Sequence, residues 1–195
     1  CVRKQLCFSF LFSCSSILYS WCSSIFLTNE LSSLFIIASI SEWLGTLKYS
    51  ILSINNSGIK TEELALKVCN WNEEEAKNAT KALLSQLGNK VEAIISNNDE
   101  MAIGAIEALQ KYGYNKGNGS KTITVVGVDA IPAAQELIKQ GVMTGSVLQD
   151  APAMAEACYA IGINLVKGKP PLEGTQYKFD ETGVAVRIPY REYMQ

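Results

Sequence analysis

Residues 91–109 read VEAIISNNDEMAIGAIEAL, and this stretch decides the fold. It begins with a mostly apolar run, 91–96, which is typical of a buried strand. The polar residues that follow, 97–99, have the chemistry that caps the amino end of a helix. From Glu100 to about Tyr112 apolar residues recur at helical spacing, and Gly113 ends the helix. A strand followed directly by a capped helix is the building unit of an α/β fold.

The same alternation continues on both sides of this unit. Further strands are expected at 64–68, 122–128 and 142–148, and further helices at 72–87, 131–140 and 151–166. Two short strand-like runs, 176–179 and 184–188, come last. The alternation predicts an α/β domain with a mostly parallel sheet flanked by helices.

The amino-acid composition excludes several classes of function. The chain has 195 residues, of which 48% are hydrophobic and 18% are charged, and this is typical of a globular protein. Its net charge of −2 gives no general attraction to nucleic acid. It contains no histidine, which excludes His-based catalytic triads and His-ligated zinc in this chain. No pair of carboxylates is placed for catalysis, so we expect a binding protein rather than an enzyme.

The first part of the chain has a different composition from the rest. Residues 5–29 carry no charge, and Arg3 and Lys4 precede them. A positive start followed by an apolar run of at least about 20 residues is typical of a signal or membrane-anchoring segment. The same stretch is rich in Ser and Cys and lacks periodicity, as out-of-frame translation also produces. Residues 1–41 are therefore either a targeting, membrane-like segment or an out-of-frame one, and the functional region is 42–195.

Polar side chains follow three of the expected strands at the points where these strands end. Asn98 follows the strand at 91–96, Asp129 follows that at 122–128, and Gln149 follows that at 142–148. Ligands of open parallel sheets bind beyond the carboxyl ends of the strands. One carboxylate and two carboxamides offer both donors and acceptors, which suits the hydroxyls of a neutral sugar. Trp71, after the strand at 64–68, offers an apolar plate for a sugar ring.

Each candidate also has a plainer interpretation. Asn98 and Asp129 have the chemistry of helix caps, Asp129 for the helix near Pro132. Gln149 is an ordinary solvated loop residue in this alternative, and Trp71 is a core residue. Only the convergence of these side chains at successive strand ends favours a ligand site.

At these residues the sequence resembles a known family. The segments 94–105, 125–130 and 145–150 resemble the periplasmic-type sugar-binding proteins of ABC importers. Together with 58–62 and Trp71, they are most similar to the galactose/glucose-binding members. The resemblance covers about residues 54–195. Single pieces of it, such as VGVDA at 126–130, are shared with ribose-binding relatives and LacI-type repressors.

The resemblance implies a fold of two α/β lobes with sugar bound in the cleft between them. It implies that Asn98 and Asp129 bond sugar hydroxyls and that Trp71 stacks on one face of the pyranose. Gln149 stands where the galactose/glucose members usually have Asn, so the resemblance implies a longer contact there. Glu92 matches one ligand of a structural calcium site in the family. The calcium-binding loop has no counterpart here, so Glu92 is expected to be vestigial and no cofactor is expected.

The resemblance also predicts the organisation of the chain. Residues of about 54–148 and 186–195 correspond to the C-terminal lobe, about 149–185 to a remnant of the other lobe, and the first lobe is otherwise missing. The expected function is that of a substrate-binding component, in fragment form, of an ABC-type galactose/glucose importer. Its expected partners are a hexose and the membrane permease, and its expected location is the cell envelope, periplasmic or extracellular and membrane-associated. The alternatives are a LacI-type effector-binding domain and a membrane-anchored sugar-sensing module without a transport role.

Overall fold

The computed structural model describes residues 33–38, 51–52, 54–117 and 119–194. The chain divides into two compact units. The first, which we call the sheet unit, comprises Cys14–Gln149 and Arg191–Gln195. The second, the α6 unit, has Asp150–Tyr190 as its described part. The segment 5–29, predicted as a possible membrane anchor, lies outside the described residues.

The sheet unit is built on a six-stranded sheet with the strand order β2-β1-β3-β4-β5-β6. Its strands are β1 (Ser33–Ala38), β2 (Glu62–Val68), β3 (Ala93–Ser96), β4 (Thr124–Asp129), β5 (Gly145–Leu148) and β6 (Arg191–Met194). All neighbours from β2 to β5 are parallel, and β6 is antiparallel to β5. The predicted α/β fold with a mostly parallel sheet is confirmed.

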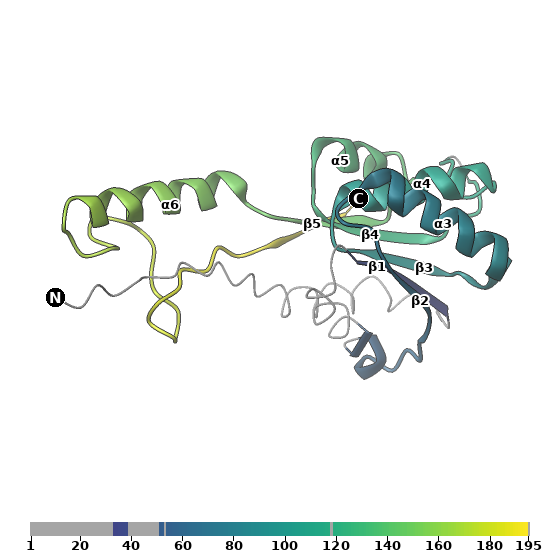
Figure 1. The fold of residues 1–195 in the computed structure, drawn as a ribbon, viewed down its shortest axis with the longest axis horizontal. Helices are drawn as coiled ribbons and strands as arrows, with labels where there is room; N and C mark the ends of the chain where they lie inside the picture. Colours follow the sequence, from purple (N-terminus) through teal and green to yellow (C-terminus); the bar gives the residue numbers. More distant parts are fainter. Residues whose placement is uncertain (1–32, 39–50, 53, 118, 195) are drawn as a thin grey trace. The chain divides into compact units, whose positions relative to one another are not determined.

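Three helices lie on one face of this sheet, as Figure 1 shows: α3 (Glu73–Leu87), α4 (Asp99–Lys111) and α5 (Pro132–Lys139). Helix α3 begins at the N-cap Asn72, whose side chain accepts from the Glu75 amide, and acidic residues occupy its first turn. Helices α3 and α4 pack against each other at Gly104, where an added Cβ would overlap the Glu73 carbonyl oxygen. This close approach brings the start of α3 beside the first half of α4.

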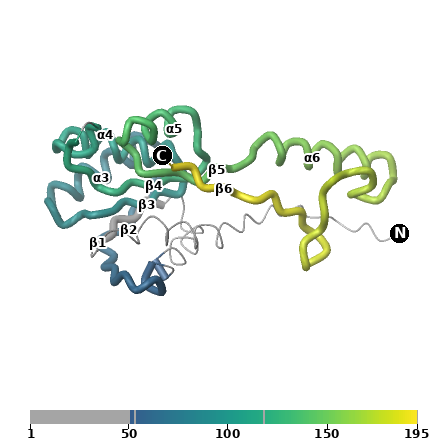
Figure 2. The backbone as a smooth tube through the Cα atoms, turned by 180° about the vertical axis from the view of Figure 1, so that it is seen from behind, coloured from purple at the N-terminus to yellow at the C-terminus, as the bar shows by residue number. Residues whose placement is uncertain are grey.

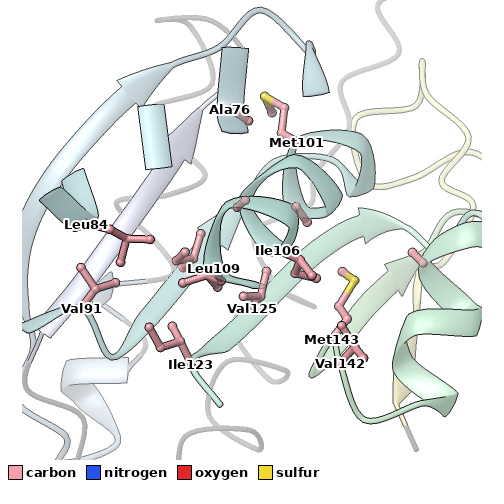
Figure 3. Packing of buried hydrophobic residues seen from close by; sticks show 14 of the residues in the cluster. Ala76, Leu84, Val91, Met101, Ile106, Leu109, Ile123, Val125, Val142 and Met143 are labelled. Carbon is pink, nitrogen blue, oxygen red and sulfur yellow. The ribbon is translucent and has the colours of Figure 1, made fainter. Parts of the chain in front are cut away.

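The core of the sheet unit lies between the sheet and these helices (Figure 3). Ile94 of β3 and Val125 of β4 are fully buried, and Met101, Ile106 and Leu109 of α4 belong to the same buried cluster. Their spacing along α4 follows the helical repeat, so the apolar stripe expected from the sequence is the face that packs on the sheet. This packing fixes α4, and with it the residues that begin α4, relative to β3 and β4.

One buried amide joins the amino end of β4 to neighbouring loops. Asn115 is 1% exposed, and its Nδ2 donates to the carbonyl oxygens of Ile123 at 2.8 Å and Val142 at 2.9 Å. Its Oδ1 accepts from the Ile123 amide at 2.8 Å. Asn115 thus fixes the amino end of β4, whereas Asp129 lies at its carboxyl end.

The α6 unit contains α6 (Ala151–Val166), which begins at the N-cap Asp150. Two of its residues, Ala157 and Ile161, are buried, whereas Tyr159 and Val166 are exposed. The strand-like runs predicted at 176–179 and 184–188 form only an isolated bridge between Phe179 and Val186. The two strands that connect the units, β5 and β6, lie side by side in the sheet, as the tube in Figure 2 also shows.

The structure differs from the predicted boundary between the N-terminal segment and the functional region. Strand β1, Ser33–Ala38, falls within the range 1–41 but is paired with both β2 and β3. The short apolar run at 34–40 has the length of a sheet strand. The sheet therefore draws on residues before position 42.

Candidate functional site

The carboxyl ends of β3, β4 and β5 lie at one edge of the sheet because these three strands are parallel neighbours. Asn98 follows β3, Asp129 is the last residue of β4, and Gln149 follows β5. The backbone thus places these three candidates along the same edge. The switch point of the strand order lies beside them, between β1 and β3, where open α/β sheets bind their ligands.

The side chains of Asp129 and Gln149 are in direct contact. Gln149 Nε2 donates a hydrogen bond to Asp129 Oδ1, and both residues are half-buried. Burial raises the pKa of the Asp129 carboxyl to about 6, the bond from Gln149 opposes this, and the charge of Glu100 adds to it. The alternative that Asp129 caps the next helix is wrong, because α5 begins at the N-cap Ile131 without a side-chain cap.

Asn98 is buried, and it is the N-cap of α4. Its Oδ1 accepts from the Met101 amide at 3.0 Å, so the plainer interpretation of this residue as a helix cap is confirmed. Its Nδ2 donates to Glu100 Oε2 at 2.7 Å. Glu100 thus bonds Asn98 and acts electrostatically on Asp129. The cap leaves a second lone pair on Oδ1 for another donor.

Trp71 lies in the turn between β2 and α3. Its side chain is 39% exposed, so it is not the core residue that the alternative interpretation described. Asn70 and Trp71 both have positive φ, at 45° and 61°, and the amide of Asn72 bonds the carbonyl of Cys69 at 2.7 Å to close the turn. Strand β1 separates β2 from β3 in the sheet. Stacking of Trp71 on a sugar stays a prediction.

Glu92 precedes β3, at the strand end opposite Asn98. Its carbonyl accepts from the Thr124 amide at 3.2 Å. Within the described part of the chain, no three acidic or cysteine side chains lie together as metal ligands would. Calcium takes six to eight oxygen ligands, so the described surroundings of Glu92 do not fit this ion.

The loop that carries Asp129 has an unusual backbone. Asp129 and Ala130 have φ values of 109° and 51°, a region that residues with a side chain rarely adopt. Two buried polar side chains hold this loop, and the sequence analysis missed both. They are Asp99, the first residue of α4, and Ser146 of β5. The one signal for them was Gly127, since a glycine inside a β-branched strand often marks a close approach.

The edge of the sheet therefore carries a mixed set of hydrogen-bonding groups. The Asp129 carboxylate accepts, and the amides of Gln149 and Asn98 donate and accept. The described neighbours of Asp129 are the Gln149 amide, which bonds it, and the carboxyl groups of Glu100 and Asp99, which interact with it electrostatically. The arrangement is suited to binding a neutral molecule with several hydroxyl groups.

Comparison with known proteins identifies the family. The sequence model of a family described as "Periplasmic binding protein domain" matches residues 36–170, which is more than half of the chain. The chain belongs to this periplasmic binding protein family. The resemblance predicted from the sequence is thereby confirmed, and the match begins within β1.

Two curated relatives carry the names of binding proteins. The D-galactose/methyl-galactoside binding periplasmic protein of Haemophilus influenzae is 40% identical over 144 residues, 73% of this chain and 41% of the relative. A xylitol-binding protein of Mycolicibacterium smegmatis is 32% identical over 106 residues, 54% of this chain and 29% of the relative. This member of the family thus spans less than half the length of both relatives.

Comparison with solved structures finds the same fold in solute-binding proteins. A periplasmic solute-binding protein of an ABC transporter from Actinobacillus succinogenes, solved with bound D-allose, aligns with a TM-score of 0.73 at 18% identity. The alignment covers 91% of this chain and 58% of that protein. In the described part of this periplasmic binding protein, no helix has the length and apolar composition of a membrane span.

Proposed function

We propose that this chain is the sugar-binding portion of a periplasmic solute-binding protein of an ABC importer and that its ligand is a neutral hexose, galactose or glucose. The observation that carries the proposal is the Asp129–Gln149 pair at the carboxyl edge of the sheet. The 40% identity to a galactose-binding relative supports the choice of sugar. Relatives that bind xylitol and D-allose extend the candidates to other polyols.

The chemistry of binding follows from the donors and acceptors. A sugar hydroxyl that donates to Asp129 and accepts from Gln149 Nε2 would enter between the two side chains and exchange their mutual bond for two new ones. A carboxylate acceptor makes stronger hydrogen bonds than a neutral one. A second hydroxyl would use the free lone pair of Asn98 Oδ1. Trp71 would supply the apolar contact with the ring.

The affinity of this chain alone is expected to be low. In the two-lobe arrangement that the family implies, a sugar is bonded from both sides of a cleft. Bonds from one side provide about half of the polar contacts, and each unmade buried hydrogen bond costs about 1–3 kcal/mol. The interval between millimolar and micromolar binding is only about 4 kcal/mol. We therefore expect millimolar rather than micromolar binding by the 195-residue chain, and docking on permease subunits belongs to the whole protein.

The test is an NMR titration of the 15N-labelled chain with D-galactose, D-glucose and D-galacturonate. The expected result is a saturable shift of the side-chain amide signals of Gln149 and Asn98 with either hexose. Galacturonate should bind more weakly, because its carboxylate is repelled by Asp129 and Glu100. The variant Asp129→Ala should lose the response to both hexoses. Hexose-induced shifts that avoid these amides, or that survive in Asp129→Ala, would contradict the proposal.

A further inference from the structure

The turn that follows β4 needs a source of stability outside itself. Asp129 and Ala130 are consecutive non-glycine residues with positive φ, and such conformations persist only where surrounding structure enforces them. Helix α5, which follows, does not stabilise the turn through a cap, because the side chain of its N-cap residue, Ile131, makes no hydrogen bond. Gln135 Nε2 does bond the Ala130 carbonyl at 2.7 Å, but this fixes the acceptor side of the turn only.

Asp99 provides the missing acceptors. It is fully buried at the start of α4, and its Oδ2 accepts from the Ile131 amide at 2.8 Å. Its Oδ1 accepts from Ser146 Oγ at 2.6 Å, and the same Oγ accepts from the Ala130 amide at 3.0 Å. The Ser146 hydroxyl therefore donates a hydrogen bond to Asp99 and accepts one from the Ala130 amide. Both amides after Asp129 are thus connected to one carboxylate.

The sheet is shaped to admit this carboxylate. Gly127 lies two residues before Asp129 and therefore on the same face of β4. An added Cβ at Gly127 would overlap Asp99 Oδ1 and lie 2.9 Å from Met143 Cε. Ser146 is the residue paired with Gly127 across the β4–β5 register. The absence of a side chain at Gly127 lets the Asp99 carboxylate lie directly over the strand pair that ends at Asp129 and Leu148.

We infer that Asp99 is a positioning residue which, through Ser146 and the amides of Ala130 and Ile131, holds the Asp129 carboxylate against Gln149 for ligand binding. The ligand part of this inference rests on the proposed function. Asp99 itself is enclosed by protein and does not touch the ligand in this scheme. Its effect on binding is exerted through the conformation of the turn.

The protonation state of Asp99 gives the inference a specific signature. Burial raises the pKa of Asp99 to about 7, the bond from Ser146 and the Ile131 and Ala130 amides oppose this, and the charge of Asp129 adds to it. The charged groups that bear on the network are thus Asp129 at the end of β4 and, next to Asp129, Glu100 of α4. Protonation of Asp99 removes an acceptor from the turn near neutral pH.

The experiment is amide hydrogen exchange and a pH titration, both followed by NMR on the whole 195-residue chain. The variants are Asp99→Asn, which keeps the shape but replaces one acceptor with a donor, and Ser146→Ala, which removes only the hydroxyl. Asn115→Ala is the matched control. The Asn115 side chain is as buried as that of Asp99 and makes three hydrogen bonds, but at the opposite end of β4.

Asp99→Asn should accelerate exchange at Ala130 and Ile131 by about tenfold or more, as loss of a hydrogen bond to a charged group predicts. Ser146→Ala should accelerate exchange of the Ala130 amide but not of the Ile131 amide, because the Ile131 amide bonds Asp99 directly. In Asp99→Asn the Gln149 side-chain amide should also move toward the position of an unbonded amide. The wild-type shifts of Ala130 and Ile131 should include a component with a midpoint near pH 7, and Asp99→Asn should lose this component and keep only the one near pH 6 that Asp129 contributes.

The inference is overturned if the two turn amides and the Gln149 amide respond no more to Asp99→Asn and Ser146→Ala than to Asn115→Ala. It is equally overturned if the turn is released but the hexose-induced shifts of Gln149 stay at wild-type size. Failure of the proposed function is recognised separately, because it appears as an absent hexose response in the wild-type chain. In that case the exchange rates and the Gln149 signal still decide whether Asp99 positions Asp129.

Discussion

At the scale of single residues, the structural role of Asn98 is compatible with the binding role proposed for it. Its Oδ1 caps α4, and its Nδ2 bonds Glu100, so the side chain is held in one orientation before any ligand arrives. A preorganised side chain loses less conformational entropy on binding than a mobile one. The helix cap is therefore also what makes Asn98 suitable as a ligand contact.

The cap gives a prediction for stability. Asn98→Ala should lower the free energy of unfolding by about 1 kcal/mol, within the range of about 0.5–2 measured for N-caps, because the Met101 amide loses its acceptor. Asn98→Ser is the control, since the serine hydroxyl also caps but cannot replace the donor to Glu100. Urea unfolding should place Asn98→Ser close to the wild type. Equal losses in both variants would show that the bond to Glu100, rather than the cap, stabilises the helix.

The sequence predicts some residues of the candidate site but not others. Asn98, Asp129 and Gln149 were predicted because each follows a recognisable strand, and position at a strand end follows from the order of the chain. Asp99 was missed because an acidic residue in the first turn of a helix is normally solvated there. Its burial depends on the packing of α4 over Gly127, which only the folded structure contains.

At the scale of elements, the predicted helices match α3 to α6 closely, because the apolar spacing of these helices and the side-chain caps of α3, α4 and α6 are local properties. The strands at 176–179 and 184–188 were overpredicted, because an apolar run becomes a strand only if a neighbour pairs with it. The structure pairs just Phe179 with Val186 there. Conversely, β6 is charged and short, and it is a strand because β5 offers it an edge.

Two glycines inside helices should respond oppositely to the same change. Gly104→Ala should destabilise the fold by on the order of 1–3 kcal/mol, because the new methyl group would overlap the Glu73 carbonyl and force α3 and α4 apart. Gly162→Ala in α6 meets nothing within 4 Å, so it should be neutral or stabilise its helix by up to about 1 kcal/mol. Thermal unfolding followed by circular dichroism measures both. A Gly104→Ala variant as stable as the wild type would show that the two helices separate without loss.

At the scale of the whole molecule, two carboxyls, the buried Asp99 and the half-buried Asp129, should determine how stability varies with pH. Asp99 and Asp129 have folded pKa values of about 7 and about 6, against 3.8 when unfolded. A raised pKa means that the folded state holds the proton more tightly, so this stabilisation is complete at low pH and is lost as the pH rises from about 4 to about 7. Glu74 and Asp180 have lowered pKa values, so their opposite effect falls at lower pH.

Urea unfolding at a series of pH values should therefore show the free energy of unfolding falling between about pH 4.5 and 7.5. The Asp99 contribution is on the order of a few kcal/mol, since one pKa unit corresponds to about 1.4 kcal/mol. In Asp99→Asn this decrease should be much smaller, and the remainder should come from Asp129. A stability that rises over the same interval in the wild type would contradict the assignment of these carboxyls.

The division into two units leads to a prediction about folding. Every residue of the buried apolar cluster belongs to the sheet unit, and β5 and β6 pair directly, with Leu148 opposite Arg191. The whole α6 segment, Asp150–Tyr190, therefore leaves and returns at one point of the sheet. If it is replaced by an Asn-Gly dipeptide, Gln149 and the dipeptide form a three-residue loop, a common length for a β-hairpin. The shortened chain should then fold without α6.

The measurement is a comparison of the amide spectra of the shortened and intact chains. Signals from β3, α4 and β4 should keep their positions, and thermal unfolding should stay cooperative, because the burial that stabilises these elements is unchanged. A control with Asp150–Tyr190 replaced by a flexible segment of equal length separates the loss of α6 from the shortening of the loop. A shortened chain without dispersed signals, beside a control that retains them, would indicate that the hairpin is strained. Loss of dispersion in both would show that the sheet unit needs the α6 segment for folding, and the two units would then be one cooperative structure.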